Sequence, residues 1–142
     1  MEISEVRRGL RQTIERARRK SAERRAQADA AGHAYEQFLL SAATPVFRMV
    51  ANALTAEGYP FKVFTPGGGL VLSSERSAGN SIELRLDPLA DPPTVIAVIT
   101  RERGSRVLTA ERPVRADVTI DRLAEEDVLQ FLLTEIEPFV ER

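Results

Sequence analysis

The sequence contains no cysteine and no tryptophan, and it has a single histidine, His33. Without cysteine the chain has no disulfides and no thiolate chemistry, which fits a reducing compartment. A zinc site built from cysteine and histidine is excluded, because such sites need several of these ligands. A Ser-His-Asp triad would depend on His33, and no G-x-S-x-G segment supplies its serine. We predict that His33 lies at the surface or a helix junction, and that the chain has no catalytic residue, metal or cofactor.

Long apolar runs are also lacking. No stretch approaches the ~20 apolar residues of a membrane span. The first twenty residues contain no apolar core of a secretory signal, so we expect a cytoplasmic protein. Lysine is scarce, since Lys20 and Lys62 are the only two. The excess of arginine is typical of a GC-rich coding genome, or alternatively of selection for bidentate contacts with anions.

The charge is unevenly distributed along the 142 residues, a length that suits one domain with its own core. Residues 1–32 contain nine Arg or Lys and five Asp or Glu, a net charge of +4, whereas the remainder carries −5. We therefore divide the chain into a basic helical arm, residues 1–32, and a single domain, residues 33–142. A basic arm beside an acidic body indicates an acidic partner, or contact between the arm of one copy and the body of another.

Two helical segments are expected at the N-terminus. Residues 2–31 lack proline and are rich in good helix formers. Gly32 is a plausible hinge, because glycine weakens a helix interior. Thr44 and Pro45 have the form of an N-cap and a first helical residue, and a helix ending near Gly58 would follow. We expect a helix that is kinked or broken near Pro45.

From Pro60 onward the apolar residues alternate with period two, which is typical of strands. Segments 61–65, 70–74, 81–87, 94–103 and 106–111 are separated by turn residues, including Gly104-Ser105, which suits a type II′ hairpin turn. Segment 114–120 alternates again and would add an edge strand beyond Pro113. Residues from Asp121 on then predict a helix with Val128, Phe131, Leu132, Ile136 and Val140 facing inward. The predicted fold class is α+β: N-terminal helices, a five- or six-stranded antiparallel meander, and a C-terminal helix packed on one sheet face.

Three small groups of residues are candidates for chemical sites. Pro66-Gly67-Gly68-Gly69 lacks the lysine of a phosphate loop and leads into a strand, so a hairpin turn is the better interpretation. Glu83 and Asp87 flank Arg85 on one strand face and could hold a divalent metal, but an arginine pairing with both carboxylates is favoured. Arg101, Arg103 and Arg106 form a second basic group around the Gly104 turn, which Glu102 interrupts, and we interpret them as solubilising charge at a hairpin tip.

The arm carries a stripe of arginines. Arg7, Arg11, Arg18 and Arg25 fall within about 40° of one another on a helical wheel, and Arg8 and Arg19 flank them. Such a stripe could follow the phosphates of a nucleic acid or lie on an anionic membrane surface. Acidic residues interleave with it and no aromatic residue precedes Tyr35, so base stacking is not available within the arm.

Apolar residues also indicate self-association. Ile3, Val6, Leu10 and Ile14 form one stripe on the arm, and segment 95–99 is apolar on both strand faces. The candidate self-association residues are Ile3, Val6, Leu10, Ile14, Val95, Ala97 and Ile99. The leading hypothesis is a non-enzymatic interaction or oligomerisation module that binds itself as a homodimer, or another protein. The alternatives are a nucleic-acid-binding protein and, third, a small enzyme with a carboxylate or arginine pocket.

Overall fold

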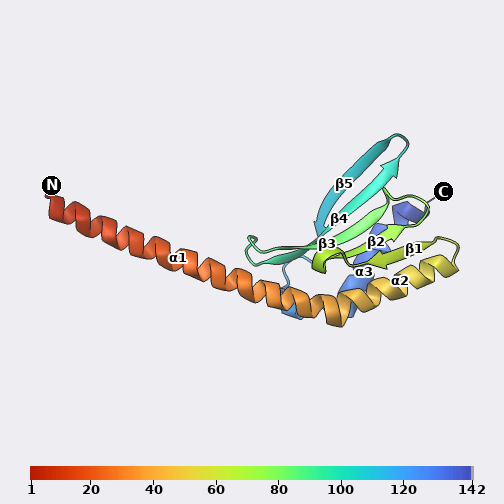
Figure 1. Cartoon of the computed structure of the whole chain (residues 1–142), viewed down its shortest axis with the longest axis horizontal. Coiled ribbons are helices and arrows are strands. Elements are labelled where there is room, and N and C mark those ends of the chain that lie inside the picture. The colour runs from red at the N-terminus through yellow and green to blue at the C-terminus, as the bar shows by residue number, and fades with distance from the viewer. Residues whose placement is uncertain (142) are drawn as a thin grey trace.

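A computed structural model describes residues 1–141 and shows a long helix leading into a sheet with helices on one side (Figure 1). The fold is α+β, as the sequence predicted, with an antiparallel sheet between N-terminal helices and a C-terminal helix. The helical segments are α1 (Ile3–Phe38), η1 (Leu39–Ala43), α2 (Thr44–Ala56), η2 (Pro66–Gly68), η3 (Ile120–Arg122) and α3 (Glu125–Val140). The strands are β1 (Phe61–Phe64), β2 (Leu70–Ser74), β3 (Ser81–Asp87), β4 (Thr94–Arg103) and β5 (Arg106–Pro113).

The N-terminal helix changes direction where α1 meets α2, but the chain stays helical throughout (Figure 1). The bend coincides with η1, which is a π-helical turn. Pro45 explains its position, because proline has no N–H to donate and its ring clashes with the carbonyl four residues earlier. The expected kink near Pro45 is confirmed. The proposed N-cap is wrong, since Thr44 has helical angles (φ −62°, ψ −46°), and α1 continues through Gly32 without a break.

The sheet is a meander in which each strand pairs with the next along the chain, in the order β1-β2-β3-β4-β5. All four pairings are antiparallel. β4 and β5 are joined by a two-residue turn, since Arg103 pairs with Arg106. Gly104 has a positive φ of 64° in this turn, and Ser105 does not, as a type II′ turn requires.

The sixth strand does not form, and the sheet has five strands among the described residues. The pairing of β5 with β4 ends just after Pro113. Its last backbone hydrogen bond is the one that the Val114 N–H donates to the Val95 carbonyl, at 3.1 Å. Asp117 then adopts a positive φ of 61°, which an extended strand cannot accommodate. Residues 114–120 instead form the connection from β5 to α3. The side chains of Val114 and Ile120 are buried in the core and hold this connection in place.

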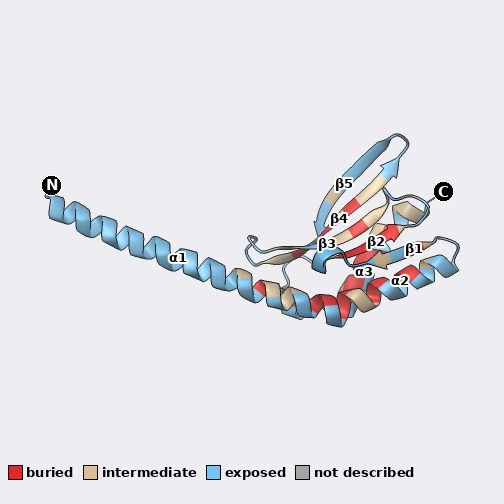
Figure 2. Ribbon diagram, in the orientation of Figure 1, coloured by how far each residue is buried: buried red, intermediate tan, exposed pale blue. Residues whose placement is uncertain are grey.

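The core lies between one face of the sheet and the helices η1, α2 and α3 (Figure 2). The strand register places three core side chains in one row across β2, β3 and β4, because Leu84 pairs with Leu70 on one side and with Ala97 on the other. The helices cover that face, and α3 contributes the side chains that its 3.6-residue pattern predicted. The fully buried larger side chains are Phe47, Leu70, Leu72, Ile82, Leu84, Leu132, Val95 and Val128.

Leu84→Ala should lower the free energy of unfolding by about 2–5 kcal/mol, because it empties a site at the centre of this core. Leu89→Ala is a matched control, since Leu89 lies in the exposed loop after β3. It should change stability by less than about 0.5 kcal/mol. Urea unfolding measures both values. Equal effects would contradict the strand register described here.

Candidate interaction surfaces

The first two-thirds of α1 project from the body into solvent (Figures 1 and 2). Every residue from Ile3 to Gln27 is exposed, and Ala31 is the first buried residue of the helix. The apolar stripe of the arm is therefore open: Ile3 is 79% exposed and Leu10 56%. The stripe is completed by Val6 and Ile14, which are also exposed. Its four side chains have no contact partner within the body.

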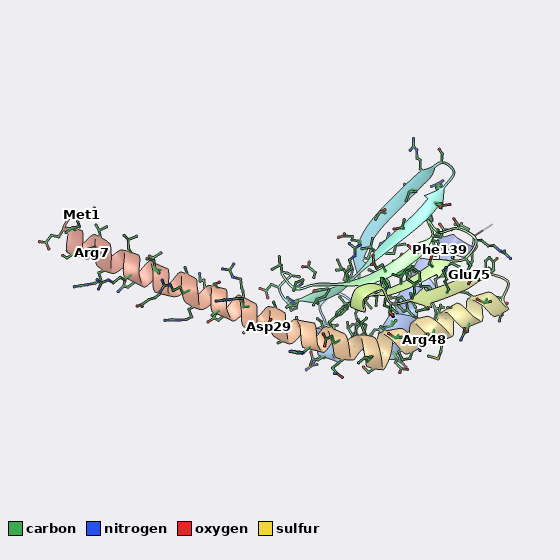
Figure 3. All side chains as sticks on the ribbon, viewed as in Figure 1. Met1, Arg7, Asp29, Arg48, Glu75 and Phe139 are labelled. Atoms are coloured by element: carbon green, nitrogen blue, oxygen red, sulfur yellow. The ribbon has the colours of Figure 1, made fainter. Side chains whose placement is uncertain are left out.

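The arginine stripe of the arm is also exposed. Figure 3 shows Arg7 far from the body, near the free end of the helix. The ion pairs found among residues 1–141 join Arg85 to Glu83, Arg112 to Glu135 and Arg115 to Asp127, and none involves the arm. The candidate anion contacts Arg7, Arg8, Arg11, Arg18, Arg19 and Arg25 thus all face solvent. At 100° per residue, the stripe from Arg7 to Arg25 lies about 70° from the apolar stripe. The apolar stripe of the arm is therefore flanked on one side by the arginine stripe.

A second surface is an apolar groove between α2 and α3, with a volume of about 490 Å³. We call it the α2–α3 groove. It is open to solvent, and the large apolar side chains of Met49, Leu129 and Leu133 in its lining are exposed. Its lining consists of Val46, Met49, Val50, Ala53, Leu54 and Glu57 from α2, with Glu125, Glu126, Leu129, Leu133 and Ile136 from α3.

The two helices of this groove run in the same direction. The Tyr59 hydroxyl, just after α2, donates to the carbonyl of Val140, the last residue of α3, at 3.4 Å. The ends of the helices therefore lie together, and so do their starts. Glu125 and Glu126 consequently lie at one end of the groove and Glu57 at the other. The apolar spacing of each helix, taken alone, does not reveal this groove, because it forms only where the two helices meet.

The sheet contributes a different surface from the one that the sequence suggested. Val95, Ala97 and Ile99 are buried beneath the helices, so they are core residues and do not face a second copy. Their neighbours Ile96 and Val98 point to the opposite face, which no helix in the described chain covers, and both are half-buried. The physical reason is the strand alternation, which sends successive side chains to opposite faces.

The groups weighed as chemical sites have simpler roles. His33 is exposed on α1, and residues 66–69 form the connection between β1 and β2. Arg85 pairs with Glu83 at 2.8 Å but not with Asp87, whose carboxylate accepts the Leu89 N–H at 3.2 Å. Among residues 1–141, no three His, Asp or Glu side chains lie close enough to hold a metal ion.

Glu102 has a structural contact that the sequence did not indicate. Its carboxylate accepts the hydroxyl of Ser77 at 2.6 Å and the N–H of Gly79 at 3.0 Å. The Glu102 N–H in turn donates to the side chain of Asn80 at 2.8 Å. A Cβ at residue 79 would overlap the Glu102 side chain, so glycine is required for this contact. The turn between β2 and β3 is thereby fixed against β4.

Tyr35 lies where α1 joins the body and packs against the core. Its hydroxyl is buried and has no hydrogen-bond partner within the described part of the chain. Burial, and secondly the negative charge of Glu83, raise the pKa of Tyr35 to about 12. The hydroxyl therefore remains protonated well above neutral pH.

The segment Ile3–Ala56 contains one window apolar enough by length and composition to cross a membrane, and 39% of that window is buried inside the protein. A core helix of a globular domain passes the same test, so the window does not by itself indicate a span. Comparisons of the chain with protein-family models, curated proteins and solved structures found no match.

Tyr35→Phe should leave the free energy of unfolding at pH 7 unchanged or raise it by up to about 1 kcal/mol, because the buried hydroxyl gains no hydrogen bond in the fold. Stability of the wild type should fall between about pH 10 and 12, since an unfolded chain loses the tyrosine proton first. Tyr35→Phe should not show the part of this fall in stability that comes from the Tyr35 proton.

Tyr59→Phe is the matched control, since it removes a hydroxyl that does donate a hydrogen bond. It should lower stability by about 0.5–1.5 kcal/mol. Denaturant unfolding at several pH values measures both variants. A loss above about 1 kcal/mol for Tyr35→Phe would show that its hydroxyl is satisfied.

Proposed function

We propose that this chain is a non-enzymatic interaction and oligomerisation module, whose arm binds a second copy. The observation that carries the proposal is the exposure of the arm's apolar stripe, Ile3 to Ile14, on a helix that leaves the body. Isolated helices gain little stability from propensity alone, and most helical stability in proteins comes from packing an apolar face. A contiguous exposed apolar stripe of this kind marks an interaction site.

The free energy available from the stripe is comparable to the cost of association. Burying one fully exposed large aliphatic side chain contributes about 1.5–3 kcal/mol. The four side chains of the stripe are between 43% (Val6) and 79% (Ile3) exposed, so each contributes roughly half of that value when buried. Eight of them in a symmetric pair offset a cost of roughly 4–15 kcal/mol in lost translational and rotational freedom. Two-fold pairing is the commonest way to bury such surfaces. A homodimer is therefore the assembly that we propose.

Leu10→Glu with Ile14→Glu should convert the dimer to a monomer, because it places two charges in the apolar stripe. Both residues are exposed, so the melting temperature should equal that of the wild type at a dilution where the wild type is monomeric. Light scattering from low to high micromolar concentration measures the mass. Leu40→Glu with Leu89→Glu is the control at two exposed leucines outside the arm, and it should remain dimeric. A wild-type monomer at every concentration would refute the proposal.

The second candidate function is binding to nucleic acid, and the unpaired exposed arginines of the arm favour it. Phosphate contacts by such a stripe would be independent of sequence and strongly dependent on salt. Arg18 and Arg25 lie beyond the apolar stripe, so variants there separate this function from self-association.

If the arm binds nucleic acid, Arg18→Glu with Arg25→Glu should weaken binding at low salt. It should also reduce the slope of log K against log salt concentration by about 2, one unit for each lost phosphate contact. Arg76→Glu with Arg103→Glu is the control at exposed arginines of the body. Fluorescence anisotropy with a labelled duplex measures both. Absence of binding at low salt, or binding unaffected by the arm variant, would exclude this function for the arm.

A further inference from the structure

The α2–α3 groove is an apolar surface that this copy of the chain leaves uncovered. Met49 is 57% exposed, Leu133 55% and Leu129 37%. All three lie on the groove lining, where the helices present side chains that do not face the sheet. Apolar clefts between two helices are typical binding sites for the apolar face of a third helix.

The dimensions of the groove match one segment of this chain. Its lining runs from Val46 to Glu57 on α2 and from Glu125 to Ile136 on α3. At 1.5 Å per residue, each of these stretches is about 16 Å long. The apolar stripe of the arm, from Ile3 to Ile14, has the same length of about 16 Å. Its side chains recur at three- and four-residue spacing, as a helix bound in a groove requires.

The charges of the two surfaces are complementary. Acidic side chains lie at both ends of the groove, with Glu125 and Glu126 at one end and Glu57 at the other. The apolar stripe of the arm has a basic flank, on which Arg7 lies three residues before Leu10 and Arg11 three residues before Ile14. Rim charges of opposite sign orient a docking helix and accelerate its encounter with the groove. An amphipathic helix with an acidic flank would meet repulsion at the same rim.

The occupant must be the arm of another copy. Helix α1 is continuous from Ile3 to Phe38, and it projects away from the body (Figure 1). Docking residues 3–14 into the groove of the same chain would require α1 to break and fold back. A break leaves backbone N–H and C=O groups at two new helix ends without intrahelical partners. A second copy can supply its arm as a straight helix.

We propose that the α2–α3 groove binds the segment Ile3–Ile14 of a second copy, and that two copies exchange arms reciprocally. This inference rests on the proposed self-association through the arm and specifies its receptor. Leu10 of one copy then lies against Met49 and Leu133 of the other.

The absence of native cysteine allows a direct test by disulfide cross-linking in the full chain. Leu10→Cys is prepared with a mass tag and mixed with untagged Met49→Cys under mild oxidation. A disulfide needs Cβ atoms about 3.5–4.5 Å apart, so only a docked arm gives efficient linkage. The tagged–untagged product should exceed that of a Leu10→Cys and Leu89→Cys mixture by at least about tenfold, because docking raises the effective concentration. Leu89 is the control because its loop lies outside the groove.

A second pair of variants tests the receptor without cross-linking. Met49→Glu with Leu133→Glu should give a monomer in light scattering. Its melting temperature should match that of the wild type at a dilution where the wild type is also monomeric, because both side chains are exposed in the single chain. Phe64→Glu with Leu89→Glu, at exposed residues away from the groove, should leave the dimer intact.

The outcomes separate this inference from the proposed function. A dimer that survives the groove variant, with Leu10→Cys linking mainly to itself, would mean that arms pair with each other; the groove is then excluded and self-association stands. An internal disulfide in a monomeric Leu10→Cys, Met49→Cys double variant would place the arm in its own groove and overturn both. A wild-type monomer with no cross-link at any concentration would also overturn both.

Discussion

Packing of α2 and α3 against one face of the sheet is the contact on which the structure depends. Leu84 and Ala97 from the strands meet Phe47 and Leu132 from the helices in a single core. Because the meander has its helices on one side only, no helix of the described chain covers the opposite sheet face, and the outer sides of α2 and α3 remain open (Figure 1). The surfaces available for binding are therefore those parts of the helices and of the sheet that do not take part in this contact.

The arm differs from the body because its residues before Ala28 have no part in that core, and Ala31 is its first residue that belongs to it. Before Ala28 every residue of the chain is exposed, so the arm can change partners without disturbing the fold. The arm and the α2–α3 groove are complementary in length, apolar character and charge. In the module that we propose, the body folds through its own core and the arm associates with a second copy. The net charges of +4 on residues 1–32 and −5 on the remainder are complementary between copies.

The apolar periodicity of the sequence predicted the regular strands and helices correctly. It failed where the conformation or contact of a single residue determines the local structure. The alternation of residues 81–87 and the helical spacing from Val128 to Ile136 both gave the correct inward faces. Pro113 and Asp117 together ended the expected sixth strand, and the role of Glu102 depends on a contact with a distant turn that spacing does not encode. Val95, Ala97 and Ile99 were assigned to an interface because an apolar strand does not reveal which of its faces the helices cover. The groove had a signal that was missed: Met49, Leu129 and Leu133 widen the apolar faces of their helices beyond what one sheet face can bury.

The central claim, that the arm buries its apolar stripe in a second copy, is tested most directly by amide hydrogen exchange measured at low and high protein concentration. Exchange reports local opening, so protection that depends on concentration identifies surfaces buried by association. The account predicts that residues 3–14, 46–57 and 125–136 gain protection together as concentration rises, while β3 and β4 are protected equally at all concentrations. Rapid exchange of residues 3–14 at every concentration would contradict it.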